Sequence, residues 1–288
     1  MRPVMRVASL HIHPVKSARA VDVAEAKLLP SGLAGDRRWM IVDETGRFLT
    51  QREEPRLALL SAAPTAEGLT VSAPGLPPLD VPCPTATAPQ IVAFIWRSKA
   101  TARVAESASH WLSGWLGHPL RLVWLPEGAN RPLNTAFAKG PGGVGFQDGY
   151  PVLIANTASL ADLNARLESL APMNRFRANI AIDGAVPWAE DAWLRLRIGE
   201  TELELVKPCE RCVITTLDQA TGERATPDRA GHEPLRTLQR VRKSADPRVK
   251  GALFGWNAVP RTPGLIRVGD PVEVLSRRDA PWPIRAAV

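Results

Sequence analysis

Short β-branched runs recur through the first 125 residues, and they constrain the fold more than any other feature. Turn residues separate the runs, as in Pro30-Ser31-Gly32 and Asp43-Glu44-Thr45-Gly46. Regular short strands joined by polar turns are typical of a barrel or a small sandwich. Strands are predicted over residues 5–11, 21–29, 39–43, 57–62, 69–72 and 91–96.

A helix is predicted over residues 107–116, where Trp111, Leu112, Trp115 and Leu116 have helical spacing. The tryptophans are expected to anchor the core. Residues 126–149 form a Gly/Pro/Asn-rich connection that suits a linker or a mobile loop. Its glycines lack the Gly-Lys-Ser/Thr ending of a P-loop, so a nucleotide site is not predicted there.

The second half of the chain mixes helices with strands. Ser159-Leu160-Ala161-Asp162 fits a capping box that opens a helix, and Glu233-Pro234-Leu235 places proline in the first turn of another. Strands are predicted at 176–182, 193–198 and 202–206, and a hairpin with a Gly-Asp turn at 264–274. The predicted class is β-rich α+β, with units at residues 1–125 and 126–288.

Composition limits the classes of function. Hydrophobic residues make up 45% of the chain and charged residues 23%, which is ordinary for a globular protein. No stretch is long and apolar enough to span a membrane, and the N-terminus has no signal-peptide pattern. The chain's 3 cysteines are too few for a disulfide framework. A cytoplasmic protein without a membrane span is expected.

The formal net charge of +7 raises the question of nucleic acid. The arginines are spread along the chain, and no RNP-type or zinc-finger pattern is present. Nucleic acid is therefore not the expected partner. A generally basic surface favours anionic ligands, including phosphorylated cofactors.

The segment 207–212, Lys-Pro-Cys-Glu-Arg-Cys, carries the strongest chemical signal. Cys212 follows a guanidinium and precedes the β-branched run 213–216, which is predicted to be a strand. Cations near a thiol favour the thiolate, which suits nucleophilic chemistry or ligation of a soft metal. A buried structural cysteine is the alternative.

Other uses of this cysteine pair fit the sequence less well. A structural zinc site needs four ligands, and no second cysteine pair or His-x-His cluster follows at usable spacing. His11 and His13 are expected to be ordinary core or surface groups. A thioredoxin-like pair opens a helix after a strand, whereas this pair is predicted to precede a strand.

Basic residues near the ends of predicted elements form a second candidate group. Residues 175–179, Arg-Phe-Arg-Ala-Asn, alternate their polar side chains as on one face of a strand. Lys16, Arg37, Arg177 and Arg211 are candidates to bind one anionic ligand, although each also suits a surface turn or a solvated edge.

Several short motifs occur in order along the chain: 13–17 (HPVKS), 32–37 (GLAGDR), 148–151 (DGYP), 159–164 (SLADLN), 176–180 (FRANI), 207–212 (KPCERC) and 264–274. Taken together they resemble the MOSC family with its own N-terminal β-barrel domain. The likeness runs from about residue 5 to 275, and the shared order of the motifs makes it specific. That family includes the mitochondrial amidoxime-reducing component and bacterial proteins that detoxify hydroxylaminopurines.

The resemblance implies a molybdenum cofactor, in which molybdopterin and a protein cysteine hold the metal. It implies Cys212 as the metal ligand and catalytic residue, while Cys209 is expected to be structural or supporting. The resemblance also implies the fold of the two units: an N-terminal β-barrel-like domain followed by a MOSC-type β-barrel with a few helices. The implied cofactor-binding residues are Lys16, Ser17, Arg37, Asp148, Gly149, Tyr150, Arg177, Asn179, Glu210, Arg211, Cys212 and Asn257.

The implied reaction is the two-electron reduction of small N-hydroxylated substrates such as hydroxylamines, amidoximes and N-hydroxylated bases. A [2Fe–2S] cluster needs four thiolates and this chain has 3 cysteines, so no ferredoxin-type cluster is expected in it. A separate donor is expected, namely a ferredoxin, a flavodoxin or a cytochrome-type reductase system. Glu210 and Trp256 depart from common residues of the family, which leaves the usual substrate preference open but not the cofactor. The alternative function is a non-catalytic molybdenum-cofactor or sulfur carrier, with a persulfide on Cys212.

Overall fold

Strands dominate the computed structural model, which describes residues 4–224 and 232–285. A first group of strands comprises β1 (Arg6–Ile12), β2 (Val21–Val23), β3 (Glu25–Leu29), β4 (Gly32–Leu33), β14 (Val152–Asn156), β15 (Ile180–Asp183), β16 (Trp193–Ile198), β17 (Thr201–Glu210), β18 (Leu253–Thr262), β19 (Gly264–Arg267) and β20 (Val272–Arg277). A second group comprises β5 (Trp39–Val42), β6 (Ser61–Pro64), β7 (Gly68–Ser72), β8 (Leu79–Pro82), β9 (Gln90–Ile95), β10 (Ser98–Ala105) and β11 (Arg121–Trp124). A short ribbon pairs β12 (Arg131–Pro132) with β13 (Gly143–Val144).

Helices are few in the described ranges. The α-helices there are α1 (Glu106–Leu116), α2 (Thr157–Asn164) and α3 (Leu235–Val241). Short 3₁₀ helices are η1 (Pro55–Leu59), η2 (Met173–Phe176), η3 (Ala189–Ala192) and η4 (Val213–Thr216). The predicted β-rich α+β class is therefore confirmed. None of these helices, within the described parts of the chain, is long and apolar enough to cross a membrane.

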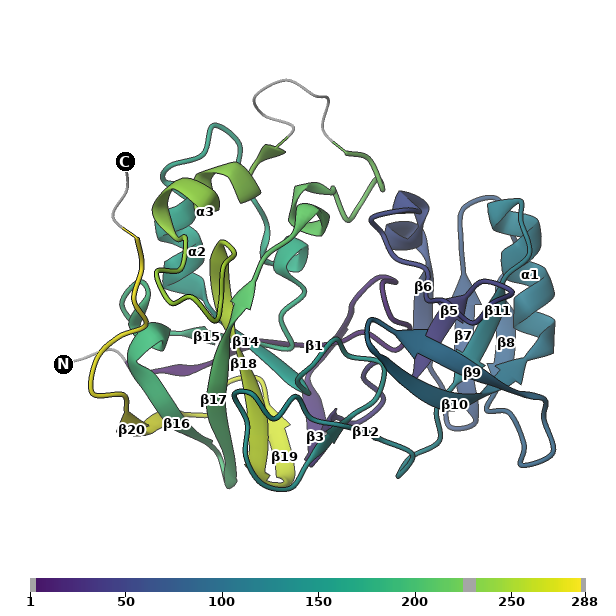
Figure 1. Ribbon diagram of the computed structural model, residues 1–288, viewed down its shortest axis with the longest axis horizontal. Coiled ribbons are helices and arrows are strands. Elements are labelled where there is room, and N and C mark those ends of the chain that lie inside the picture. The colour runs from purple at the N-terminus through teal and green to yellow at the C-terminus, as the bar shows by residue number, and fades with distance from the viewer. Residues whose placement is uncertain (1–3, 225–231, 286–288) are drawn as a thin grey trace.

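The strands form two units that lie side by side (Figure 1). The large unit contains the sheet β2-β1-β15-β14-β18-β17-β16-β20 and the sheet β19-β3-β4. The small unit contains the sheets β5-β11-β10-β9 and β6-β7-β8, with α1 on its outer flank (Figure 1). Among the described residues the pairings form open sheets, not closed rings.

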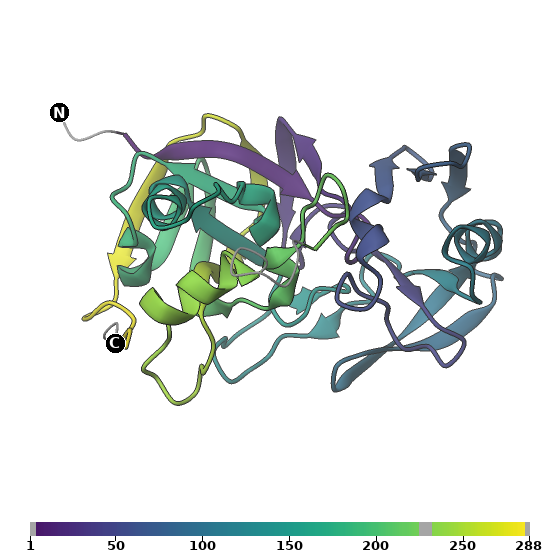
Figure 2. The ribbon, with the colours of Figure 1, turned by 90° about the horizontal axis from the view of Figure 1, so that it is seen from above.

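The first strands of the chain belong to the large unit. β1 pairs with β15, and β3 pairs with β19. The chain then crosses to the small unit at β5 and returns after β11, and Figure 2 shows the two lobes that result. The division at residues 125 and 126 remains a prediction about sequence domains. The loops that join the two units meet at their junction, which positions the candidate site.

Each unit has its own apolar core. In the large unit, Trp193 and Trp256 are fully buried against residues of β1, β14 and β15. In the small unit, Leu112 and Leu116 of α1 pack against the strands, while Trp111 and Trp115 are only partly buried on the same core. The predicted helix over 107–116 is thus confirmed to within one residue.

Trp256, which departs from a common residue of the family, is not among the residues that line the cavity described below. Its exposed fraction is 1%, and its indole N–H donates to Asp191 Oδ1 over 3.1 Å. The guanidinium of Arg278 lies 4.0 Å from the centre of its ring. Trp256 is a core residue because its backbone alternation in β18 turns it inward.

Three predicted strand segments are wrong at least in part. Residues 57–62 begin as η1, where proline opens the turn, and only Ser61 starts a strand. Phe176 ends η2 and Arg177 has a left-handed φ of 54°, so residues 175–179 do not alternate on a strand face. Residues 213–216 form η4, since the amide and hydroxyl of Thr215 both donate to the carbonyl of Cys212.

Two supersecondary predictions also fail. The segment 264–274 is not a hairpin, because β19 pairs with β3 and β20 pairs with β16. The helix α2 is capped by Asn156, whose side chain accepts from Ala158 N, and not by Ser159. The Ser159 hydroxyl is buried and donates to Glu190 Oε2 over 2.9 Å. The Ser159 side chain binds Glu190, which is distant in sequence, and so does not form the predicted capping box.

Candidate functional site

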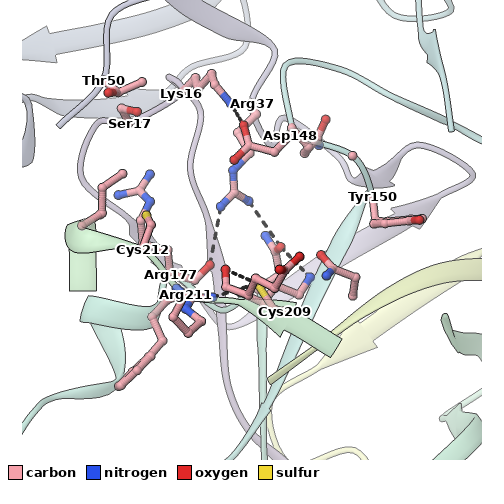
Figure 3. A pocket seen from close by; sticks show the side chains of 18 of the residues that line it. Lys16, Ser17, Arg37, Thr50, Asp148, Tyr150, Arg177, Cys209, Arg211 and Cys212 are labelled. Atoms are coloured by element: carbon pink, nitrogen blue, oxygen red, sulfur yellow. Dashed lines mark hydrogen bonds and ion pairs between the residues drawn. The ribbon is translucent and has the colours of Figure 1, made fainter. Parts of the chain in front are cut away.

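The residues predicted to bind the cofactor line one cavity at the junction of the two units. Figure 3 shows side chains converging on it from several loops. From the predicted set, the lining comprises Lys16, Ser17, Arg37, Asp148, Gly149, Tyr150, Arg177, Asn179, Glu210, Arg211, Cys212 and Asn257. Cys209, which was expected to be structural or supporting, also lines the cavity. The lining residues that the sequence did not single out are Thr50, Arg52, Gln147, Leu153, Phe176 and Ile214.

Tight turns place three of these side chains. Ser17, Arg37 and Arg177 have φ values of 65°, 48° and 54°, in the left-handed region. This conformation costs roughly 1–2 kcal/mol for a residue with a side chain. Such strain persists where the surroundings enforce it, and it clusters at functional sites. At Gly32 an added Cβ would lie 2.5 Å from Pro151 O, so the loop leading to Arg37 lies tightly against the loop that follows Tyr150.

Asp36 is the buried centre of the hydrogen bonds below the cavity, with 1% of its surface exposed. Its Oδ1 accepts from the backbone N–H of His13 over 2.8 Å and from Asn179 Nδ2 over 3.1 Å. Its Oδ2 accepts from Arg37 Nη1 over 2.7 Å and from Gln147 Nε2 over 3.2 Å. One carboxylate thereby fixes the positions of three cavity side chains.

Lys16 and Asp148 pair at another side of the cavity. The Lys16 ammonium is buried, donates to Phe146 O over 2.8 Å and forms an ion pair with Asp148 Oδ1. Burial lowers the pKa of Lys16, while Asp148 opposes that shift. The Asp148 side chain is 61% exposed. Burial would raise the pKa of its carboxyl, but the charge of Lys16 outweighs this effect, and the pKa of Asp148 is lowered. Asp148 Oδ1 also accepts from Trp96 Nε1 over 2.9 Å.

The end of β17 delivers both cysteines. The pairing of β17 with β18 is irregular between Leu205 and Lys207 and again between Pro208 and Glu210. Bulges bend a strand and re-aim its side chains, and they are common beside active sites. The chain then leaves β17 with Arg211 and Cys212 directed to the cavity, as Figure 3 shows.

Each cavity cysteine has an arginine donor. Arg211 Nη1 donates to Cys209 Sγ over 3.0 Å, and its Nη2 donates to Phe176 O over 2.8 Å. Arg52 Nη2 donates to Cys212 Sγ over 3.2 Å. Arg52 comes from the loop before η1, which is distant in sequence from Cys212. No local pattern marks Arg52, so the sequence could not reveal this contact.

Some predicted residues use their polar atoms to bind the surrounding protein. Glu210 accepts from Lys207 Nζ and from the N–H groups of Lys250 and Gly251, at 2.7 to 3.0 Å. Burial would raise the pKa of Glu210, but these donors lower it. The Tyr150 hydroxyl donates to Asn134 O over 3.2 Å, and burial raises its pKa to about 12. The carboxylate of Glu210 thus links the end of β17 to the backbone of the 250–251 loop through hydrogen bonds.

Asn257 lines the cavity and also binds the neighbouring strand. It lies on β18 and donates through Nδ2 to Lys207 O over 3.2 Å. Its side chain therefore supports the bulged part of β17 while lining the cavity.

The cavity has an excess of positive charge. Among the described residues, Arg52, Arg177 and Arg211 form no ion pair with a carboxylate; their acceptors are sulfur atoms and backbone carbonyls. Arg177 Nη2 and Arg211 Nε are buried, and neither has a hydrogen-bond partner among the residues that the structure describes. Burial, together with the neighbouring charge of Arg37, lowers the pKa of Arg177 to about 9. Unused buried donors of this kind fit a phosphate group, and the Cys212 thiol fits a soft metal.

Acid should destabilise the protein through the groups below the cavity. His13 is fully buried, and burial, then the charges of Arg37 and Arg177, hold its pKa well below the usual value. Burial would raise the pKa of Asp36, but Arg37 and His13 lower it well below its ordinary value. Below about pH 6.5 for histidine and about pH 4 for aspartate, the unfolded chain then binds protons that the folded chain does not.

We therefore expect the free energy of unfolding to fall as the pH falls from 7 to 5, and to fall further below 4. Urea unfolding at a series of pH values measures this dependence. The His13→Gln variant should show a shallower slope between pH 7 and 5 than the wild type. An unchanged slope in that variant would contradict the assignment to His13.

Comparisons with known proteins agree with the arrangement of the chain. The MOSC N-terminal beta barrel domain matches residues 4–119, and the MOSC domain matches residues 141–273. The chain is 37% identical to mitochondrial amidoxime-reducing component 1 of Homo sapiens over 292 aligned positions, which cover 96% of this chain and 85% of that protein. It is 36% identical to the Mus musculus component 1, over 96% of this chain and 84% of that protein. It is 33% identical to mitochondrial amidoxime reducing component 2 of Homo sapiens, over 94% and 84% of the two chains.

Proposed function

Because this chain belongs to the MOSC family, with both the MOSC N-terminal β-barrel domain and the MOSC domain, we propose that it reduces N-hydroxylated compounds with a molybdenum cofactor. The substrates are small hydroxylamines, amidoximes or N-hydroxylated bases. The name of these relatives, amidoxime-reducing component, supports an N-reductive activity. The cofactor and the substrates of this chain are our proposal.

One observation carries the proposal: a thiol and unpaired arginines line the same cavity. Cys212 supplies the soft ligand, and Arg177 and Arg211 supply buried donors without partners among the described residues. A molybdopterin cofactor requires this combination, since it contains a sulfur-bound metal and a phosphate. Cys212 would hold the metal, and Lys16, Ser17, Arg37, Arg177, Asn179 and Arg211 would hold the pterin and its phosphate.

When bound, the cofactor supplies a two-electron redox centre that can take oxygen from an N–O bond. The overall reaction consumes two electrons and two protons and converts R–NHOH to R–NH₂ and water. The chain's own residues orient the reactants. Asp36 keeps Arg37 and Asn179 in place, and Arg52 holds the sulfur of Cys212 through its guanidinium. Lys16 keeps the exposed carboxylate of Asp148 at the cavity.

We also propose that a separate protein supplies the electrons, as a ferredoxin, a flavodoxin or a cytochrome-type reductase system. The protein is proposed to work in the cytoplasm, although its curated relatives are named for mitochondria. Substrate reduction by the purified protein with NAD(P)H alone, without a partner, would contradict the separate donor.

Arg177→Ala should weaken retention of the pterin. Hydrogen bonds to charged groups contribute about 1.5–3 kcal/mol, so we expect roughly 10- to 100-fold weaker binding. The measurement is pterin released and retained during gel filtration of the purified variant. The control is Arg166→Ala, which removes an exposed arginine paired with Asp162 and should leave pterin content unchanged. Equal pterin content in both variants would remove Arg177 from the binding set.

A further inference from the structure

Trp96 occupies the tip of the hairpin that β9 and β10 form. The hairpin turns through Trp96 and Arg97, between the paired residues Ile95 and Ser98. Trp96 has a φ of 53° and is 55% exposed. Two-residue hairpin turns with a positive φ favour glycine or asparagine. The chain therefore places a large indole in the solvent against both its backbone preference and its hydrophobicity.

The indole is nevertheless held on several sides. Its Nε1 donates to Asp148 Oδ1 over 2.9 Å. The guanidinium of Arg52 lies 5.0 Å from the centre of its ring. Phe48 meets it edge-on, with ring centres 5.0 Å apart at 70°. These contacts fix the orientation of Trp96 while more than half of the residue stays accessible.

Two of these partners belong to the cavity. Asp148 and Arg52 both line it, and Arg52 also donates to Cys212 Sγ over 3.2 Å. Trp96 is therefore one residue removed from the thiol and lies on the small unit, next to two lining residues. The large unit contributes other lining residues, among them Arg177 and Cys212.

We infer that Trp96 is a specificity-determining residue that stacks on planar substrates. The preferred compounds carry an aromatic ring at, or one carbon away from, their N-hydroxylated nitrogen. A fixed indole offers an aromatic surface without losing side-chain freedom on binding, and stacking on aromatic side chains does not depend on a particular hydrogen-bond pattern. This inference rests on the proposed reductase function and assigns a substrate preference to it.

Two amidoximes of equal size and charge test the inference. Benzamidoxime has a planar ring, whereas cyclohexanecarboxamidoxime has a puckered one. The holoenzyme is compared with Trp96→Gly and Trp96→Phe, with dithionite-reduced viologen as the electron source. Glycine suits the positive φ of this turn, so Trp96→Gly should fold. Trp96→Phe retains an aromatic ring but has no N–H for Asp148.

Trp96→Gly should raise the KM for benzamidoxime by about 5- to 100-fold, with little change in kcat. The KM for cyclohexanecarboxamidoxime should stay within about twofold, and Trp96→Phe should keep most of the preference. An equal rise in KM for both compounds, or an equal fall in kcat, would overturn the inference and leave Trp96 as a support for Asp148.

Binding of the two product amidines provides a second readout that does not need turnover. Calorimetric titration with benzamidine and cyclohexanecarboxamidine should show that Trp96→Gly weakens only benzamidine binding. If the wild type reduces neither amidoxime, the proposed function fails, yet selective loss of benzamidine binding would still support the stacking role. Equal binding of the two amidines to the wild type would overturn it.

Discussion

Replacement of Cys212 by alanine is expected to abolish reduction of N-hydroxylated substrates. Cys212 is the thiol that lines the cavity beside Arg52, whose Nη2 lies 3.2 Å from its sulfur. Under the proposed function, alanine would remove the soft ligand of a bound metal, whereas the pterin would keep its contacts with the cationic side chains. We expect part of the molybdenum to remain and the turnover to fall by at least about 100-fold, because losing a ligand itself should cost at least as much as the roughly 10- to 100-fold typical of losing a group that supports a ligand. Turnover of an amidoxime with an artificial electron donor measures this effect.

The other cysteines provide matched controls for this variant. Cys209 also lines the cavity but is bound by Arg211, and Cys209→Ala should retain at least part of the activity. Cys83 lies on the small unit among apolar residues, and Cys83→Ala should retain nearly all of it. Full activity in Cys212→Ala would refute the ligand assignment. Complete loss in Cys209→Ala would instead point to a shared role of the two thiols.

Replacement of Asp36 by alanine is expected to have the largest effect on stability. Asp36 is 1% exposed and accepts from Arg37, Asn179, Gln147 and the His13 backbone. Removing one partner of a buried ion pair leaves an uncompensated charge and typically costs about 3–5 kcal/mol. The expected loss in the free energy of unfolding is therefore about 3–5 kcal/mol, measured by urea unfolding at pH 7.

Asp22 is the matched control for Asp36. Its carboxylate accepts from His11 Nδ1 over 2.7 Å, but its side chain is 88% exposed. Exposed pairs contribute between 0 and about 1 kcal/mol, so Asp22→Ala should change stability by no more than that. Similar losses of stability in the two variants would show that Asp36 does not stabilise the cavity more than an exposed carboxylate does.

The sequence predicted the elements whose own pattern is strong. The strands at β1, β5, β7 and β16 follow from alternating or continuous apolar residues, and α1 follows from the spacing of its leucines and tryptophans. The errors fall where specific hydrogen bonds, tertiary at Ser159 and local at Thr215, override residue preferences. Residues 213–216 are β-branched but turn as η4, because Thr215 bonds back to Cys212.

The motifs were sufficient to name many residues of the candidate site, but the contacts between those residues could not be predicted from the sequence. The resemblance named Lys16, Arg37, Arg177 and Cys212, which are far apart in the sequence, and the structure brings them to one cavity. Arg52 and Trp96 were missed because no local pattern distinguishes an arginine or a tryptophan that will meet a distant loop. Their partners, Cys212 and Asp148, lie more than fifty residues away along the chain.

The central claim concerns the cofactor, and its content can be measured directly. The protein would be purified from a host that makes molybdenum cofactor, and molybdenum and pterin would be determined per chain beside Cys212→Ala. The account predicts close to one molybdenum and one pterin per chain, with the metal lost or loosened in the variant. Absence of both from the wild type, in a competent host, would contradict it. A labile extra sulfur on Cys212 in that protein would instead support the sulfur carrier.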